Sequence, residues 1–319
     1  MLFRSRGGEK LPDERPVRTL SSGQRKYRRE RERGGHRQPP RRLPAGHRDG
    51  APALHAGAEP QLNGNRPRET SDGYGEISDV AIKRKLRNVL QDQGERIFVQ
   101  SDERADDGYK SLSERAKAEI NNGKKLSGDE YAAIACEKFI DVRSFGQVFA
   151  FKKTKDSAEV SVGVRGPVSV HPAFSVDPIE IEDIQITKSV NSEPGEKKSS
   201  DTMGMKYRTK FGLYVLKGSI NPQLAEKTGF SDDDAEKIHK ALINLFENDS
   251  SAARPEGSVL VEKVYWFKHE SKLGQYPTVK VHRSVKVKLK EGVDEEKSAE
   301  DYSITYDELP NLDVSIYSI

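Results

Sequence analysis

The feature that most constrains the fold is a change in composition at about residue 61. Residues 1–61 contain 8 Gly, 7 Pro and no Ile, with 15 Lys and Arg against 7 Asp and Glu. Such a segment cannot bury enough apolar surface to offset the entropy lost on ordering, so we expect it to be disordered. It is interpreted either as a basic arm for nucleic acid or as a non-native segment.

The rest of the chain shows helical and strand patterns in turn. A helix is predicted to begin at Ser78 or Asp79, because Ile82, Leu86 and Val89 recur on one face at helical spacing. The other expected elements are a helix capped by Ser127, helices opening at Pro222 and Ser231, and strands at about 145–151, 160–164, 179–186, 207–215, 258–268 and 278–289. This order predicts an α+β fold with a ferredoxin-like or RRM-like sheet that lacks its first strand.

Charge and the rare residue types narrow the possible functions. Beyond residue 61 the chain carries 39 Lys and Arg against 44 Asp and Glu, so an RNA site there must be local. The single Cys136 rules out an internal disulfide and a cysteine-built zinc site, and no apolar run approaches the roughly 20 residues that span a bilayer. The histidines lack metal-ligand spacing, and no phosphate loop or nucleophile elbow occurs. We therefore expect a cytoplasmic protein without cofactor or metal, and not an enzyme.

The most informative motif is Arg165-Gly166-Pro167-Val168, which is followed by His171 to Ile179 between two alternating strands. With the other segments this stretch resembles the guide-RNA-coating backbone subunit of the CRISPR complex Cascade in its type I-C form, the Cas7 family, from about Leu62 to Leu289. The other segments that carry the resemblance are 63–68, 78–87, 141–146, 202–205, 211–214 and 241–247.

The resemblance implies a hand-shaped protein. Residues 62–290 would form a modified RRM palm with a helical fingers insertion at about 92–140 and a β-hairpin thumb at about 186–208, followed by an acidic, weakly structured tail at 291–319. Copies of the chain would polymerise along crRNA in a helical filament, with other Cascade subunits, and present the guide for pairing with target DNA in antiviral defence.

The resemblance fails at the start of the chain. Family members begin with an apolar strand directly before the segment that matches Leu62, whereas this chain has the Arg/Pro/Gly-rich stretch. We therefore expect the first palm strand to be replaced by the disordered N-terminus. Such a loss would leave unpaired backbone groups in the sheet, with lower stability and impaired assembly.

The predicted RNA contacts are cations and stacking groups from several segments. Cations at the start of a surface helix suit phosphates, and residues where a helix meets a sheet strand can face bases. Met203 and Met205 resemble apolar wedges that separate bases. The full set is Arg66, Arg68, Lys83, Arg84, Arg87, Arg143, Ser144, Phe145, Gln147, Arg165, Lys188, Met203, Met205, Lys206 and Arg208.

Two other functions stay open from the sequence. Related backbone subunits of type III complexes cleave RNA with metal and an acidic loop residue, and Asp72 and Asp79 lie in that general region. A stand-alone RNA-binding protein with residues 1–61 as its basic arm is the third reading.

Overall fold

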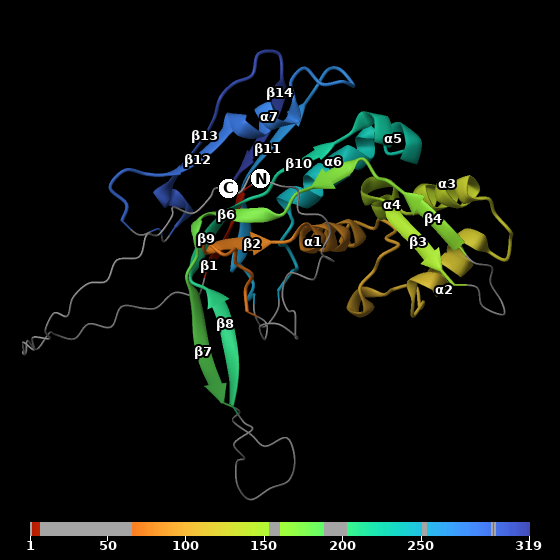
Figure 1. The fold of residues 1–319 in the computed structure, drawn as a ribbon, viewed down its shortest axis with the longest axis horizontal. Helices are drawn as coiled ribbons and strands as arrows, with labels where there is room; N and C mark the ends of the chain where they lie inside the picture. The colour runs from red at the N-terminus through yellow and green to blue at the C-terminus, as the bar shows by residue number, and fades with distance from the viewer. Residues whose placement is uncertain are drawn as a thin grey trace, which may run out of the picture. The chain divides into compact units, whose positions relative to one another are not determined.

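The computed structural model describes residues 2–6 as a strand backbone, and residues 66–152, 160–187, 203–250, 254–294, 296 and 298–319. Residues 1–7 and 54–319 form one compact unit. Its centre is a six-stranded sheet in the order β14-β11-β1-β9-β6-β2, in which every neighbouring pair is antiparallel (Figure 1). The strands are β14 Asp313–Ser318, β11 Val259–Lys268, β1 Leu2–Arg6, β9 Phe211–Val215, β6 Ala173–Pro178 and β2 Tyr74–Ile77.

Strand β1 corrects the prediction that the first strand of the sheet is missing. Leu2–Arg6 lies between β9 and β11 and pairs with both, with Arg4 opposite Leu213 on one side and Leu260 on the other. The prediction was wrong because composition was judged over the whole of residues 1–61, where five residues weigh little. Pairing through the backbone needs no apolar run, and two partners satisfy the polar groups of a short strand. Disorder of residues 7–61 stays a prediction, because they lie outside the described part.

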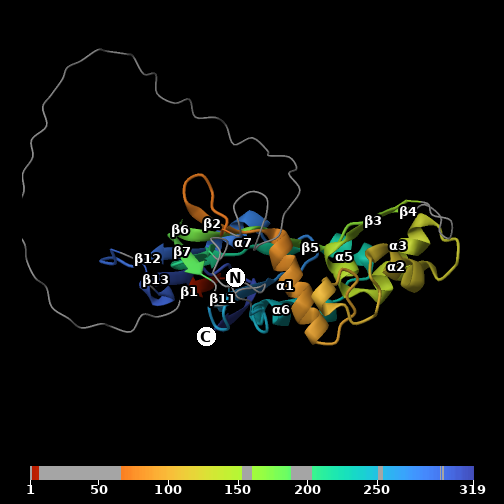
Figure 2. The ribbon, with the colours of Figure 1, turned by 90° about the horizontal axis from the view of Figure 1, so that it is seen from below.

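Two helices pack against one face of the sheet. Helix α1 spans Asp79–Asp92 and begins at Ser78, whose side chain accepts a hydrogen bond from the Ala81 amide. Helix α6 spans Asp232–Ile243, and a capping box formed by Ser231 and Asp234 opens it. The apolar stripes of both helices form one core with strand residues, among them Ile82, Leu86, Ile238, Tyr214 and Val264. Figure 2 shows α1 and α6 side by side, in agreement with their contacts. The predicted helix starts at 78–79 and 231 are confirmed.

The C-terminal residues cover part of the opposite face. Strands β12 Val285–Leu289 and β13 Tyr302–Tyr306 form a two-stranded ribbon whose apolar side packs against Phe211 and Leu213 of β9. The Tyr302 hydroxyl donates to Asp177 Oδ2 at 2.7 Å, and burial followed by the carboxylate raises the pKa of that phenol. The expected weakly structured tail at 291–319 is therefore wrong: alternation of apolar residues at 302–306 and 313–318 supplies two strands despite the acidic composition. The strand expected at 278–289 begins as a helix, α7 Thr278–Ser284.

The insertion between β2 and β6 has a core of its own. It contains η1 Asp102–Arg104, α2 Leu112–Ala116, the π-helical turn η2 Lys117–Asn121, α3 Gly128–Lys138, α4 Ile140–Phe145 and the ribbon β3 Gln147–Phe151 with β4 Val160–Val164. Its helical part, expected at about 92–140, runs to Phe145, so the strand predicted from Phe145 begins two residues later. Phe98 contacts the edges of the Phe139 and Phe149 rings.

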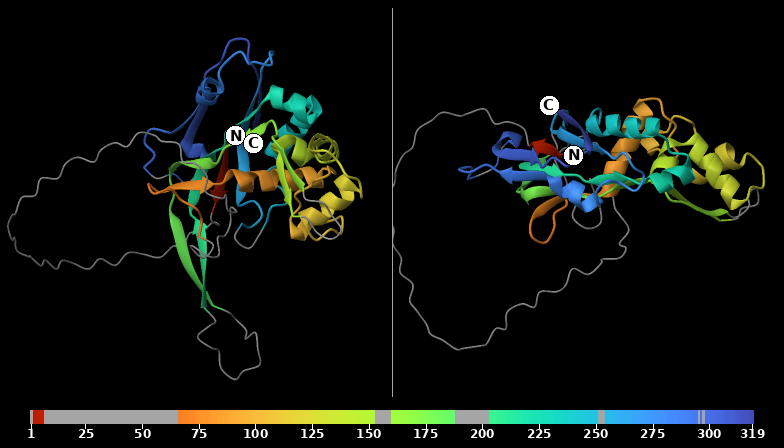
Figure 3. Two further views of the ribbon diagram at one scale, coloured as in Figure 1. Left: turned by 45° about the vertical axis from the view of Figure 1, so that its right-hand side comes forward. Right: turned by 90° about the horizontal axis from the view of Figure 1, so that it is seen from above.

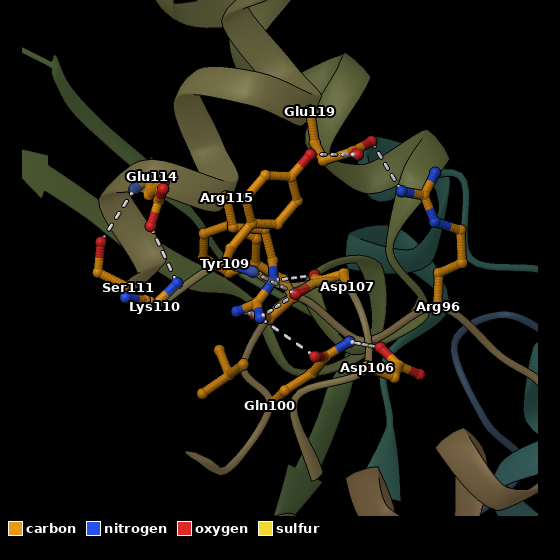
Figure 4. A network of polar contacts seen from close by, with 12 residues as sticks. Arg96, Gln100, Asp106, Asp107, Tyr109, Lys110, Ser111, Glu114, Arg115 and Glu119 are labelled. Carbon is orange, nitrogen blue, oxygen red and sulfur yellow. Dashed lines mark hydrogen bonds and ion pairs between the residues drawn. The ribbon is translucent and has the colours of Figure 1, made fainter.

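A buried arginine fixes the loop before α2. Arg115 donates to both carboxylate oxygens of Asp107, at 2.5 and 2.9 Å, and to the Phe98 carbonyl at 2.9 Å (Figure 4). The Asp107 hydrogen bond outweighs the cost of burial and raises the pKa of Arg115. The charge-rich stretch that follows α1 is thus ordered by ion pairs where apolar patterning is weak.

Two further ribbons complete the unit. The hairpin of β7 Ile181–Thr187 and β8 Met203–Thr209 extends beyond the sheet (Figures 1 and 3). It contains the described part of the predicted thumb, and the hairpin begins at Ile181, five residues before the start predicted for the thumb. The ribbon of β5 Val168–Val170 and β10 Gly218–Ile220 packs against α1 and α4, and α5 Pro222–Thr228 follows it.

Candidate nucleic-acid interface

The structure brings the predicted residues of α1 and α4 together around a buried carboxylate. Asp141 has no exposed surface; its Oδ1 accepts from the Phe98 amide at 2.7 Å and its Oδ2 from the Val99 amide at 3.1 Å. Arg87, whose side chain is 12% exposed, donates from Nε to the same Oδ2 at 2.9 Å. Its guanidinium lies 5.2 Å from the Phe145 ring centroid. Arg87 therefore joins the helical insertion to α1, and its charge is already neutralised.

The other two cations of α1 also have partners. Lys83 pairs with Asp79 one turn earlier at 3.0 Å. Arg84 donates to the Val99 carbonyl at 2.5 Å, and burial, followed by the nearby Arg87, lowers its pKa. Asp79, one of the two acidic residues considered for RNA cleavage, serves here in the first turn of a helix, where a carboxylate is favourable.

The structure gives Arg143 and Ser144 roles in packing: Arg143 is half-buried and ion-paired, and Ser144 is fully buried. Arg143 makes a bidentate pair with Asp234 of α6, with Nε–Oδ2 at 3.0 Å and Nη2–Oδ1 at 2.8 Å. Ser144 is fully buried, because α4 continues through Phe145 and turns this position inward. The RNA contact predicted for Ser144 is thus corrected, and Arg143 is assigned to the packing of α4 on α6. Both Arg143 and Asp234 line a cleft of about 560 Å³ with Cys136, Lys227 and Lys237.

Arg165 is the exposed cation of this region. In the described part of the chain no carboxylate lies within 4 Å of it. It stands between β4 and β5, beside a close approach of two glycines. A Cβ on Gly166 would lie 2.3 Å from the Ser144 carbonyl oxygen, and one on Gly146 would lie 3.2 Å from the Arg165 Cα. Only glycine permits this contact, which fixes the Arg165 backbone next to Phe145 and the half-buried Gln147.

The hairpin carries the second group of predicted residues. Met203 and Met205 are 62% and 50% exposed, on one face of β8 opposite Thr187 and Gln185. Lys206 lies on the other face, opposite Ile184, and no ion pair involves it among the described residues. Lys188, at the end of β7, lies outside the described residues.

The cations at the base of the hairpin are paired. Arg208 donates to Glu182 at 2.5 Å, and Arg66 donates to Asp183 at 2.7 Å while it lies over the Tyr207 ring. Arg68 lies 3.4 Å from Glu76. The sequence predicted these cations but not the carboxylates that pair with them. Nothing in the sequence indicates that a charged residue in one loop or strand will contact another that is distant along the chain.

Neither a metal site nor a membrane-spanning helix is found among the described residues. Among them, no group of three or more His, Cys, Asp or Glu side chains is placed to hold a metal ion. No helix in the same residues has the length and apolarity that a membrane crossing requires.

Comparison with known proteins places the chain in a family. Residues 60–307 match the family model of the CRISPR-associated protein Cas7. The chain therefore belongs to the Cas7 family, and the predicted start near Leu62 is confirmed, while the match extends past the predicted end at Leu289. A CRISPR-associated protein Cas7 from Haloferax volcanii is 26% identical over 245 residues, which are 72% of this chain and 66% of that protein.

Solved structures also resemble the chain at low similarity. A chain of a CRISPR RNA-guided surveillance complex in a pre-nicking state has 16% identity and a TM-score of 0.39, covering 65% of this chain and 73% of its own. A second surveillance-complex chain has 16% identity and a TM-score of 0.32, covering 64% and 61%. These scores are too low to establish a shared fold, so the family assignment depends on the sequence matches.

Proposed function

We propose that this chain is the non-catalytic backbone subunit of a type I-C Cascade-like complex, which polymerises along crRNA in the cytoplasm and presents it for pairing with target DNA. The observation that carries the proposal is the family match over residues 60–307. Further copies of the chain and other Cascade subunits are its proposed protein partners.

The topology supports an RRM-like palm. The central strands follow the order β11-β1-β9-β6, with α1 between β1 and β6 in the chain and α6 between β9 and β11. Two βαβ halves of this kind, with their strands interleaved, define a ferredoxin-like arrangement. On this reading the insertion with its separate core is the fingers, and the β7–β8 hairpin is the thumb.

The predicted RNA-binding residues fall into two groups, cations for phosphates and methionines for bases. Arg165 and Lys206 are available to phosphates, whereas Lys83, Arg87, Arg66, Arg68 and Arg208 would have to exchange a carboxylate for a phosphate. Met203 and Met205 offer apolar, polarisable surface on a narrow hairpin, which suits insertion between bases. A scaffold of this kind binds the guide without reading its sequence.

The test is the salt dependence of binding to unstructured single-stranded RNA. Arg165→Gln should lower the log–log slope by about 0.7, the value for one phosphate contact on a single strand. Lys288→Gln is the matched control, since Lys288 is exposed on β12 and makes no ion pair within the described residues. Equal slopes for Arg165→Gln and the parent would remove Arg165 from the interface.

The same preparation tests the absence of catalysis. Assembled protein and guide are incubated with complementary RNA and Mg²⁺, and intact RNA is the expected result. Cuts at a regular spacing would overturn the non-catalytic role and favour the nuclease reading.

A further inference from the structure

The β5–β10 ribbon has one apolar and one polar face. Val168, Val170 and Ile220 pack against the core formed with α1 and α6. Ser169 pairs across the strands with Ser219 and is exposed, as is His171 just beyond the end of β5. The outward face of the ribbon therefore presents hydroxyl and imidazole groups. The apolar face packs on the core and holds the ribbon in place.

Three residues from separate segments lie together at the end of the ribbon away from Arg165. The His171 amide donates to the Lys217 carbonyl at 2.9 Å, which sets the two residues next to each other. His282 of α7 lies with Nε2 3.0 Å from the Gly218 carbonyl, and its ring is perpendicular to the His171 ring at a centroid distance of 5.8 Å. A carbonyl only accepts, so Nε2 is the donor and the His282 ring is fixed by this bond.

The chain segments that form this cluster contain no carboxylate. Neither residues 165–171 nor residues 217–221 include an Asp or Glu. Within the described residues, no carboxylate lies within 4 Å of Lys217, His171 or His282, whereas Arg66, Arg87 and Arg143 each have one. An exposed lysine without a counter-ion on a firmly held surface favours a polyanion.

The spacing also fits an extended strand of nucleic acid. His171 lies six positions after Arg165, and an extended chain of that length spans at most about 20 Å. That distance accommodates several consecutive phosphates of a single strand. Successive phosphates of one strand are about 3.4 Å apart along the axis of a duplex, and farther apart when the strand is extended.

We propose that the outer face of the β5–β10 ribbon is a phosphate-binding strip that continues the guide-RNA path from Arg165 to a terminal cluster of Lys217, His171 and His282. The inference rests on the proposed RNA-binding function and extends it to residues outside the predicted set of RNA contacts. Lys217 supplies the charge, Ser169 and Ser219 supply hydroxyl donors, and His282 positions the end of the ribbon.

The experiment compares single lysine variants of the full chain. Lys217→Gln should lower the salt slope for single-stranded RNA by about 0.7, while Lys288→Gln, of equal charge change, should leave it unaltered. Unfolding midpoints followed by Trp266 fluorescence should be the same for both variants, since both lysines are exposed. As a check that needs no variant, bound RNA should protect Lys217, but not Lys288, from an amine-reactive reagent.

The outcomes separate this inference from the function on which it rests. If Arg165→Gln lowers the slope and Lys217→Gln does not, the strip is refuted and the RNA-binding role stands. If Lys217→Gln weakens self-association without RNA at an unchanged slope, the cluster contacts an acidic surface of a second copy and the inference is wrong. If the parent protein does not bind RNA at all, the proposed function fails first.

Discussion

Asp141→Asn is expected to be the most damaging conservative change in the chain. The substitution keeps the shape of the side chain but puts an amide NH₂ where an oxygen accepted hydrogen bonds. Whichever way the amide turns, one donor is left facing another: the Phe98 amide, or the Val99 amide with Arg87. Since Asp141 is fully buried, breaking its charge pair should lower the free energy of unfolding by about 3–5 kcal/mol.

Arg87→Gln separates the charge pair from the backbone hydrogen bonds. It removes one charged donor and leaves Asp141 with its two amide donors, so we expect a smaller loss of about 1.5–3 kcal/mol. The double variant should cost less than the sum of the two by about 1 kcal/mol or more, because both changes disrupt the same interaction. Glu180→Gln is the control: its pair with Lys210 at 3.1 Å joins side chains that are 67% and 45% exposed, so the loss should be below about 1 kcal/mol.

Urea unfolding measures all four variants. The single Trp266 reports on the core beneath α6, where it stacks on His239 at 4.6 Å, and far-ultraviolet circular dichroism reports on the helices. Coincident transitions would justify a two-state treatment. A loss for Asp141→Asn no larger than that for Glu180→Gln would refute the structural role assigned to the Arg87–Asp141 pair.

Three further predictions concern acid, glycine and methionine. Burial opposes ionisation of Asp234, but the hydrogen bonds from Arg143 and Ser231 outweigh it and leave the pKa of that carboxyl below its ordinary 3.8. The stability that comes from this shift is present above pH 3.8 and is lost as the pH falls through the lower pKa of the folded state. Asp234→Asn should therefore flatten the acid limb of a curve of unfolding free energy against pH, and an unchanged limb would contradict this. Gly166→Ala places a Cβ 2.3 Å from the Ser144 carbonyl oxygen and should destabilise by about 1–3 kcal/mol in the same urea assay, whereas Gly163→Ala, with nothing within 4 Å, should not. Replacing Met203 and Met205 by Ser should leave the unfolding midpoint unaltered but impair assembly on guide RNA seen by electron microscopy; normal filaments would exclude the methionines as wedges.

Local signals predicted well the two helices that pack on the sheet. The Ser78 cap with Ile82, Leu86 and Val89, and the Ser231–Asp234 capping box, are contained within one or two turns of chain, so sequence alone reveals them. The strand at 259–268 was found for the same reason, since its β-branched and aromatic run is continuous.

Elements that depend on distant partners were missed. Strand β1 has only five residues, and its place between β9 and β11 is set by segments more than 200 residues later in the chain. Strand β14 likewise pairs along β11 at the edge of the sheet. The carboxylates of the candidate site were missed for the same reason, because their partners are distant in the sequence. Asp141 lies 54 residues from Arg87, and Asp234 lies 91 residues from Arg143. No periodicity or cap signals such pairs.

This pairing changes how the chain can hold RNA. A cation that already has a carboxylate gains little from a phosphate, because one ion pair replaces another and the released carboxylate must be solvated again. Net attraction must then come from cations that have no ion pair within the described residues, such as Arg165, Lys206 and Lys217, and residues 62–319 as a whole carry more acidic than basic groups. A single subunit should therefore bind RNA weakly, and tight binding requires neighbouring copies whose contacts add to those with the guide. The proposed polymerisation along RNA would, on this argument, be a consequence of the charge distribution of the chain.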